Sequence, residues 1–294
     1  MSLSSSLPTF LSSQEDSRRL KFRSLLNRIL SILCVSLAGL TLIPLFSILY
    51  LVLKNGLPLL TLSVFTQLPP AAQMTGGGFG NAVIGTFVMV GIALLLAAPT
   101  GILSAIYINE YARQSSLAHA VNFVAQLLTG IPSIICGVFA FAIVVVRTGF
   151  SAWAGGLALA ILILPTILLT SEQALLNVPQ SLREASTGLG ATRLQTIWRI
   201  VLPEALPAMM TGLMLAIARA AGETAPVLFT ALFSQYWLTS LNHPTASLAV
   251  LIYNFSTLPY DHQVKLAWTA SLVLVAMVTF TNILAQILFR KKHH

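Results

Sequence analysis

Residues 29–53 have the sequence ILSILCVSLAGLTLIPLFSILYLVL, which contains no charged side chain. A helix needs about 20 mostly apolar residues to cross the hydrocarbon core of a bilayer, and this stretch is long enough. It is longer than the apolar part of a cleaved signal peptide, and no small-residue cleavage site followed by a polar chain comes after it. We therefore interpret it as a retained membrane span.

The composition of the whole chain agrees with this interpretation. Of the 294 residues, 56% are hydrophobic and 8% are charged, whereas soluble domains carry about 25% charged residues. The mean hydropathy is +0.86. So few charges cannot cover the surface of a soluble globule of this size. The composition excludes a disordered chain, disfavours a soluble enzyme and favours an all-α polytopic membrane protein.

Five further apolar runs lie at residues 82–107, 123–146, 153–169, 206–233 and 266–288. Pro99-Thr100-Gly101 interrupts the first of these, and we expect a break there. The sequence therefore predicts six membrane helices. Residues 1–25 are predicted to be a disordered tail, 26–80 the first span and an outer loop, and 291–294 a second tail. The outer loop at about 234–264 is expected to fold partly against the membrane surface.

The distribution of basic residues predicts the topology. If the N-terminus is cytoplasmic, only Lys54, Arg147 and Lys265 lie outside, and Arg219 lies within the fifth run. The inside segments then hold the twelve other bases: Arg18, Arg19, Lys21, Arg23, Arg28, Arg113, Arg183, Arg193, Arg199, Arg290, Lys291 and Lys292. Because Lys and Arg collect on cytoplasmic flanks, both termini are predicted to be cytoplasmic. The net charge of +8 then reflects orientation and not nucleic-acid binding.

The predicted cytoplasmic loop between the fourth and fifth runs reads NVPQSLREASTGLGATRLQ over residues 177–195. Ser181 with Glu184, and Thr192 with Gln195, both fit the capping box that begins a helix. We therefore expect two helix starts within this loop.

Glycine and proline punctuate the same loop. Gly190 suits the left-handed cap that ends a helix, and Pro203 is expected to stop the second helix. The prediction is a short helix at about 181–190, a glycine turn and a second helix. Capping boxes alone fit equally well an amphipathic connector that rests on lipid headgroups.

A longer pattern in this loop resembles a known family. Glu184-Ala185-Ser186, Gly190 and Ile200-x-Leu202-Pro203 have the spacing of the EAA motif of ABC-importer permeases, with Ser186 in place of the second alanine. The resemblance implies that residues 181–190 form a coupling helix, which docks on an ATP-hydrolysing partner. The positions that match the family's coupling element are Arg183, Glu184, Ala185, Gly190 and Pro203.

The source of energy is expected to lie outside this chain. A P-loop needs Gly-Lys followed by Ser or Thr, and none of the five lysines follows a glycine. The chain itself is thus predicted to be neither an enzyme nor the holder of a cofactor, with ATP and Mg²⁺ on partner subunits. A secondary transporter, driven by an ion gradient, would leave the EAA spacing unexplained. An intramembrane serine protease would need a histidine on a span opposite Ser133, and the sequence offers none.

The fifth run carries two opposite charges. Arg219 and Glu223 are four residues apart, a spacing that stacks side chains on one helix face. Charges at membrane depth are costly and mark functional sites, so we expect a gate or translocation path at Arg219, Glu223 and Thr224. The alternative is an ion pair that only pins two helices. Gly222 is expected to permit close helix approach, and Pro226 to kink the span.

Three segments narrow the resemblance to permeases of the bacterial phosphate-specific ABC importer. They are ARAAGETAPVLFT at 218–230, GIPSIICG at 130–137 and AIYINEYA at 105–112. The likeness is closer to the PstA-type subunit than to its PstC-type partner. The motif positions expected to serve packing are Gly130, Pro132, Ser133, Gly222 and Pro226.

This resemblance implies a MetI-like permease core at residues 81–290, with one extra N-terminal span. It implies a bacterial inner-membrane complex with a second, PstC-type permease, two ATP-binding subunits and an extracytoplasmic phosphate-binding protein. The implied function is import of inorganic phosphate. Import of molybdate or sulfate is the alternative, followed by secondary anion transport. No metal site is expected, because His119, His243 and His262 are scattered along the chain.

Overall fold

The computed structural model describes the backbone of residues 9–289 and side chains from Leu20 to Ile287, except those of 21 and 22. This part of the chain contains helices and connecting loops, with no strand. The C-terminal tail at 291–294 lies outside the described residues, as do the side chains of six bases assigned to the cytoplasmic side: Arg18, Arg19, Lys21, Arg290, Lys291 and Lys292. The chain divides into two compact units, residues 1–54 and 55–294.

The first unit consists of one helix, α1 (Thr9–Gly56), which continues two residues into the second unit. It contains the apolar run at 29–53, and nearly all its described side chains are exposed. A helix that is apolar on all sides suits contact with lipid. The helix begins at Thr9, so residues 9–25, predicted to be a disordered tail, are helical instead.

The second unit holds all the other elements. Four long helices are α3 (Gly80–Ile106), α7 (Ala152–Leu176), α10 (Leu202–Gly222) and α13 (Asp261–Phe289). Shorter helices are α2 (Ser63–Thr66), α4 (Ser116–Gly130), α5 (Ser133–Ala140), α6 (Val146–Thr148), α8 (Gln180–Gly188), α9 (Arg193–Thr196), α11 (Ala225–Leu228) and α12 (Leu248–Ser256). A 3₁₀ turn η1 (Leu57–Leu59) and three π-helical turns, η2 (Tyr107–Tyr111), η3 (Phe141–Val145) and η4 (Ile197–Val201), complete the unit.

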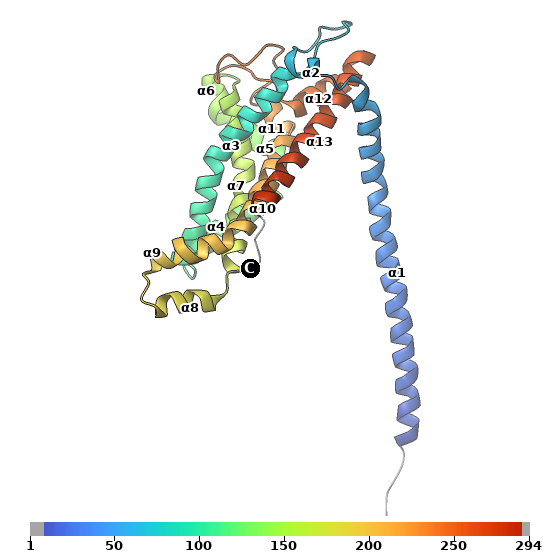
Figure 1. The fold of residues 1–294 in the computed structure, drawn as a ribbon, viewed down its shortest axis with the longest axis vertical. Helices are drawn as coiled ribbons and strands as arrows, with labels where there is room; N and C mark the ends of the chain where they lie inside the picture. Colours follow the sequence, from blue (N-terminus) through green and yellow to red (C-terminus); the bar gives the residue numbers. More distant parts are fainter. Residues whose placement is uncertain (1–8, 290–294) are drawn as a thin grey trace, which may run out of the picture. The chain divides into compact units, whose positions relative to one another are not determined.

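Within the second unit, α7 is central and packs against α3, α10, α4 and α5 (Figure 1). Over the described residues, five helices are long and apolar enough to cross a membrane, or six if the bent pair formed by α4 and the α5–α6 segment counts as one span. The prediction of a multi-pass all-α membrane protein is confirmed.

The third predicted span, 123–146, is not a straight helix. The chain bends by 106° between α4, which ends at Gly130, and the segment that begins at Ser133. Pro132 causes this bend, because proline has no N–H to donate and forces the residue before it out of the helical region. Ile131 is accordingly extended, with φ −76° and ψ 134°.

The break expected at Pro99-Thr100-Gly101 is absent, since α3 continues through it. These residues instead permit close packing: a Cβ added to Gly101 would lie 3.0 Å from Ile167 Cγ2 on α7. Nearer the N-terminus of α7, a Cβ on Gly156 would lie 2.4 Å from Ile92 Cγ2 of α3. Small residues at the interface thus hold these two helices together.

The predicted outer loop at 234–264 contains a helix. Leu248 and Leu251 of α12 are fully buried, packed with Phe79 and Leu266 in one apolar cluster. The loop therefore packs partly into the protein itself. The opposite end of the unit, around α8 and α9, has its own small cluster, which includes Leu175 and Val201.

Candidate functional site

The charged pair of the fifth span lies where its helix ends. α10 stops at Gly222, and Glu223 is extended, with φ −74° and ψ 127°. The prediction of one continuous helix over 206–233 is therefore wrong. Pro226 does not kink that helix; it lies in the first turn of the next one, α11, where its missing N–H costs nothing.

Arg219 and Glu223 nevertheless form an ion pair. Arg219 Nε lies 3.6 Å from Glu223 Oε1, and the two side chains are 36% and 17% exposed. The neighbouring Ala220 and Ala221 are buried in the central apolar cluster, which also includes Cys136 of α5. The rest of this turn is therefore anchored in the core while the guanidinium stays at its edge.

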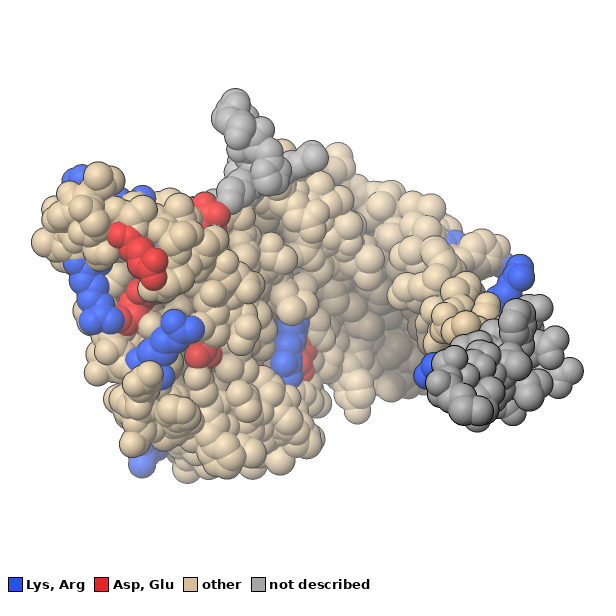
Figure 2. Space-filling model, turned by 90° about the horizontal axis from the view of Figure 1, so that it is seen from below, with Lys and Arg blue, Asp and Glu red and all other residues tan. Residues whose placement is uncertain are grey.

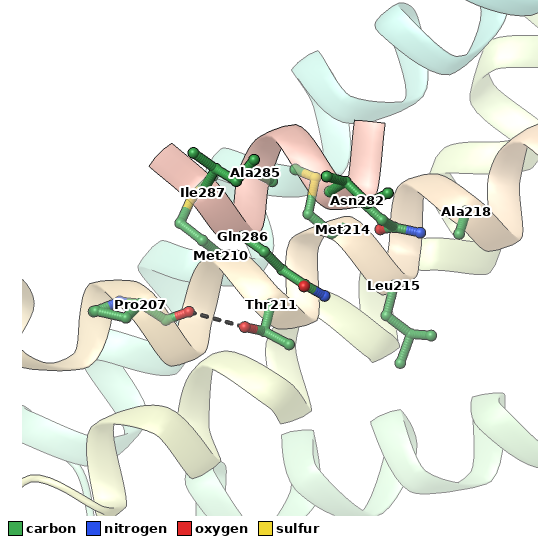
Figure 3. A pocket seen from close by; sticks show the side chains of 11 residues that line it. Pro207, Met210, Thr211, Met214, Leu215, Ala218, Asn282, Ala285, Gln286 and Ile287 are labelled. Atoms are coloured by element: carbon green, nitrogen blue, oxygen red, sulfur yellow. Dashed lines mark hydrogen bonds between the residues drawn. The ribbon is translucent and has the colours of Figure 1, made fainter. Parts of the chain in front are cut away.

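A groove runs between α10 and α13, where part of α10 is exposed. It has a volume of about 690 Å³, and Ala218, the residue before Arg219, is part of its wall. Apolar side chains line most of it, but Thr211 of α10 and Asn282 and Gln286 of α13 are polar (Figure 3). Thr211 Oγ1 donates to the carbonyl of Pro207 at 3.0 Å.

These polar groove residues were not predicted from the sequence. Asn282 and Gln286 lie four residues apart in a run read only as uncharged, and Figure 3 shows their amides pointing to the same side. Two side-chain amides at helical spacing inside an apolar span can indicate a functional surface. Their hydrogen bonds must be made to neighbouring helices or to a substrate in a pathway.

Two of the predicted packing glycines do not serve packing within this chain. Among the described residues, and apart from the adjoining backbone of its own helix, no atom lies within 4 Å of a Cβ built on Gly130 or Gly222. The close contact is made instead by Gly137, where a Cβ would lie 2.6 Å from Pro226 Cα. Pro226 thus joins α11 to α5, while Pro132 and Ser133 form the bend and the first residue of α5.

The glycine turn in the loop at 177–195 is confirmed. Gly190 has φ +82°, in the left-handed region. Its N–H donates to Thr187 O at 2.9 Å, and Ala191 N–H donates to Ser186 O at 3.2 Å. These two bonds form a Schellman motif, which satisfies the last carbonyls of α8.

Of the two predicted capping boxes, one is confirmed and one is wrong. Thr192 Oγ1 accepts from Gln195 N–H at 3.3 Å, and Gln195 Oε1 accepts from Thr192 N–H at 2.9 Å. Ser181 and Glu184 do not cap α8, which begins one residue earlier, after Pro179, without a side-chain cap. Glu184 and Ala185 lie exposed on α8 instead.

The second helix of the loop also continues further than predicted. It runs from Arg193 through η4 into α10, and this helical segment, Arg193–Gly222, is one of the candidate membrane spans and does not stop at Pro203. Pro203 is the second residue of α10, close after the π-helical turn, where the regular i to i−4 hydrogen bonding is already interrupted.

Arg183 holds this loop against the end of α3. Its Nη2 donates to Glu110 Oε1 and to Leu175 O, both at 2.9 Å, and its Nη1 donates to Val178 O at 2.7 Å. The side chains of Arg183 and Glu110 are 16% and 9% exposed. Glu110 was not predicted as a site residue; an acid directly after an apolar run is the signal that could have indicated it.

Two further contacts tie the same elements together. Arg193 of α9 lies over the ring of Tyr111, 4.9 Å from its centroid. Ser186, the residue that departs from the EAA pattern, is buried, and its Oγ lies 2.8 Å from Thr196 Oγ1. Charged side chains gather on this end of the molecule, as Figure 2 shows. Among the described residues, no group of His, Cys, Asp and Glu could hold a metal ion.

Comparison with known proteins agrees with this architecture. Residues 97–294 match the family described as "Binding-protein-dependent transport system inner membrane component". The phosphate transport system permease protein PstA of Yersinia pestis is 40% identical over 282 residues, which cover 95% of this chain and 96% of that protein. PstA of Haemophilus influenzae is 39% identical over 246 residues, covering 83% and 87%.

Solved structures share the fold. A chain of a bacterial ABC transporter involved in the import of the acidic polysaccharide alginate aligns with a TM-score of 0.62 and 20% identity, over 92% of this chain and 98% of that one. A chain of the inward-facing MetNI methionine ABC transporter aligns with a TM-score of 0.56 and 22% identity, over 71% and 92%. The predicted ABC-importer permease fold is confirmed.

Proposed function

The chain belongs to the family of binding-protein-dependent transport system inner membrane components, and from this premise we propose that it is the membrane permease subunit of an ATP-driven importer of inorganic phosphate. The observation that carries the proposal is its 40% identity, along 95% of its length, to a phosphate transport system permease. Its part in the reaction is to provide a path across the membrane that opens and closes.

The proposed assembly contains a second permease of the PstC type, two ATP-binding subunits and an extracytoplasmic phosphate-binding protein. ATP and Mg²⁺ belong to the ATP-binding subunits, because no lysine of this chain follows a glycine as a P-loop requires. The complex is placed in the bacterial inner membrane with both termini of this chain cytoplasmic. The excess of basic residues on the alternate segments supports that orientation.

We assign ATPase docking to α8. Its residues Glu184 and Ala185 are exposed, while Arg183 is anchored to Glu110 and to two carbonyls. A force applied to α8 is therefore transmitted to the end of α3 through short, partly buried hydrogen bonds. Gly190 sets the direction in which the chain leaves α8, and Pro203 lies further along, in the first turn of α10.

We assign the translocation path to the end of α10, at Arg219, Glu223 and Thr224. A fixed positive charge lowers the electrostatic barrier for an anion in a medium of low dielectric constant. Glu223 competes with phosphate for the guanidinium, which limits how tightly the anion binds and so favours its release. The polar groups of Thr211, Asn282 and Gln286 provide neutral hydrogen-bonding partners along the neighbouring groove.

Uptake of labelled phosphate tests the proposal in cells whose own phosphate importers are deleted and which express this chain with its partners. Arsenate, which has the shape and charge of phosphate, should compete strongly, while sulfate and molybdate should not. Equal competition by sulfate or molybdate would assign the chain to another oxyanion. Uptake that persists after ATP depletion but stops when the ion gradient is dissipated would instead indicate a secondary transporter.

A further inference from the structure

A second polar hollow lies at the α8 end of the molecule, apart from the groove beside Arg219. Its volume is about 400 Å³, and three arginines contribute to its wall: Arg113 from the chain after η2, Arg183 from α8 and Arg193 from α9. Asn109 and Glu110 of η2 complete the side toward α3. Three separate segments thus bring their positive charges to one place, which we call the basic hollow.

The three arginines differ in how far the protein satisfies them. Arg183 already donates to Glu110 and to two carbonyls. Arg193 lies over the ring face of Tyr111, and its guanidinium N–H groups have no hydrogen-bond partner among the described residues. Arg113 is exposed and has no hydrogen-bond or ion-pair partner among the described residues. One carboxylate therefore faces three guanidinium groups, so positive charge is in excess.

Asn109 gives a second, independent indication of a ligand. It is 6% exposed, and its Nδ2 has no hydrogen-bond partner among the described residues. Leaving a buried donor unpaired costs about 1–3 kcal/mol, so such groups are rare without a purpose. Asn109 and Arg113 also line a smaller adjoining hollow, where Glu172 accepts a hydrogen bond from Asn122 Nδ2 at 2.7 Å. That nearby acid is thus engaged with Asn122.

We propose that the basic hollow binds a phosphate-type oxyanion, either inorganic phosphate or the headgroup phosphate of an anionic lipid. Arginine is suited to this role because its planar fork donates two parallel hydrogen bonds to phosphate oxygens. A phosphate offers oxygens in several directions, which matches donors that converge from η2, α8 and α9. A bound anion would link these three elements. The inference concerns a separate site, so it does not depend on which anion crosses the membrane.

The test uses the purified transporter complex without its extracytoplasmic binding protein, reconstituted in nanodiscs of phosphatidylcholine alone. Equilibrium binding of ³²P-labelled inorganic phosphate is compared between the wild type, the double variant R113Q/R193Q and N109A. Each lost charge-assisted bond is expected to weaken binding about tenfold, and loss of the neutral Asn109 donor only a few-fold. Arg199→Gln is the matched control, because Arg199 is exposed on η4 and does not line the hollow. Every protein in the comparison, the wild-type reference included, carries Arg219→Gln, which removes binding in the proposed path.

A second arm tests the lipid source, using nanodiscs that contain phosphatidylglycerol and native mass spectrometry of the released complex. If a headgroup occupies the hollow, phosphatidylglycerol stays bound to the wild type and is lost from R113Q/R193Q, while inorganic phosphate binds poorly. R113K/R193K keeps the charge without the fork and should bind with intermediate affinity in whichever arm is positive. The proposal is overturned if the wild type retains neither anion, or if R113Q/R193Q retains both unchanged. It is also overturned if the variants lose only the ATP-binding subunit, because the hollow would then be a protein-docking surface.

Discussion

Two arginine–glutamate pairs, one at each functional region, are held in very different ways. Arg183 and Glu110 are 73 residues apart in the sequence and meet at 2.9 Å, with both side chains mostly buried. Arg219 and Glu223 are four residues apart and meet at 3.6 Å, with the arginine about one-third exposed. The first arginine has two further carbonyl partners. The polar contact of Arg219 with the described residues is its ion pair to Glu223.

The difference teaches how one chemical pair serves two purposes. A short, buried and multiply bonded pair resists separation, because either partner alone would be an unpaired charge in a medium of low dielectric constant. A longer and partly solvated pair contributes little to stability and can exchange partners. We therefore assign the Arg183–Glu110 pair to transmission of force and the Arg219–Glu223 pair to contact with a passing anion.

The largest expected effect is the loss of stability caused by Arg183→Met. The substitution leaves Glu110 buried and unpaired, which should destabilise the protein by about 3 kcal/mol or more. Thermal unfolding of the purified complex measures this. The double variant Arg183→Met/Glu110→Gln should recover much of the loss, since it removes the orphaned charge. Glu184→Gln, at the exposed neighbour on α8, is the matched control and should leave the unfolding temperature unchanged.

For the second pair, the expected effect is on transport and not on stability. Arg219→Gln should lower phosphate uptake by about tenfold or more, because the anion loses its positive partner in the path. Glu223→Gln should lower the phosphate concentration at half-maximal uptake and also the maximal rate, since the freed guanidinium holds phosphate longer. Uptake is measured after assembly of each complex is confirmed.

Stability separates the two regions in the same experiment. Neither substitution at Arg219 or Glu223 should change the free energy of unfolding by more than about 1 kcal/mol, given the exposure of the pair. Near-normal uptake in both variants would refute the path assignment. A loss of stability as large as that of Arg183→Met would show that this pair, too, is a structural clamp.

A smaller effect is expected at Gly190, which sets the turn after α8. Valine is strained at φ +82°, by about 1–3 kcal/mol. Gly190→Val should therefore displace α9 relative to α8 and uncouple ATP hydrolysis from uptake. Gly190→Asn should be tolerated, because asparagine adopts left-handed conformations readily. Gly188→Ala, within α8 and with open space around its Cβ, is the control. ATP hydrolysed per phosphate transported should rise for valine alone; an unchanged ratio would contradict the assignment of α8.

These regions also show what can be predicted from sequence and what cannot. Four of the six apolar runs, at 29–53, 82–107, 153–169 and 266–288, and the Gly190 turn were predicted correctly, because apolar length and a left-handed glycine are local properties. The bend at Pro132 and the end of α10 at Gly222 were missed, although each has a helix-breaking residue nearby. In an apolar run of adequate length, a proline or glycine is compatible with a kink, a stop or no effect, and packing decides among them.

The partners of the charged residues depend on tertiary structure. Arg219 and Glu223 were paired correctly because four residues on a helix bring side chains together. No local rule connects Glu110 with Arg183, since this pairing depends on how separate elements pack. The Ser181–Glu184 capping box was wrong because α8 begins at Gln180, directly after Pro179, so that Ser181 lies inside the helix and does not cap it.

The smallest expected effect is the loss of stability caused by Ser186→Ala, a substitution that restores the alanine of the EAA pattern. Ser186 is buried, and its hydroxyl bonds to Thr196, so the substitution leaves that hydroxyl without this partner. The cost should be about 1 kcal/mol in thermal unfolding, with uptake and ATP coupling unchanged. Thr196→Val should cost a similar amount, and the double variant little more than either alone, because both remove the same bond. Additive losses would mean that the two hydroxyls act independently, and that Arg183 alone ties α8 to the rest of the coupling region.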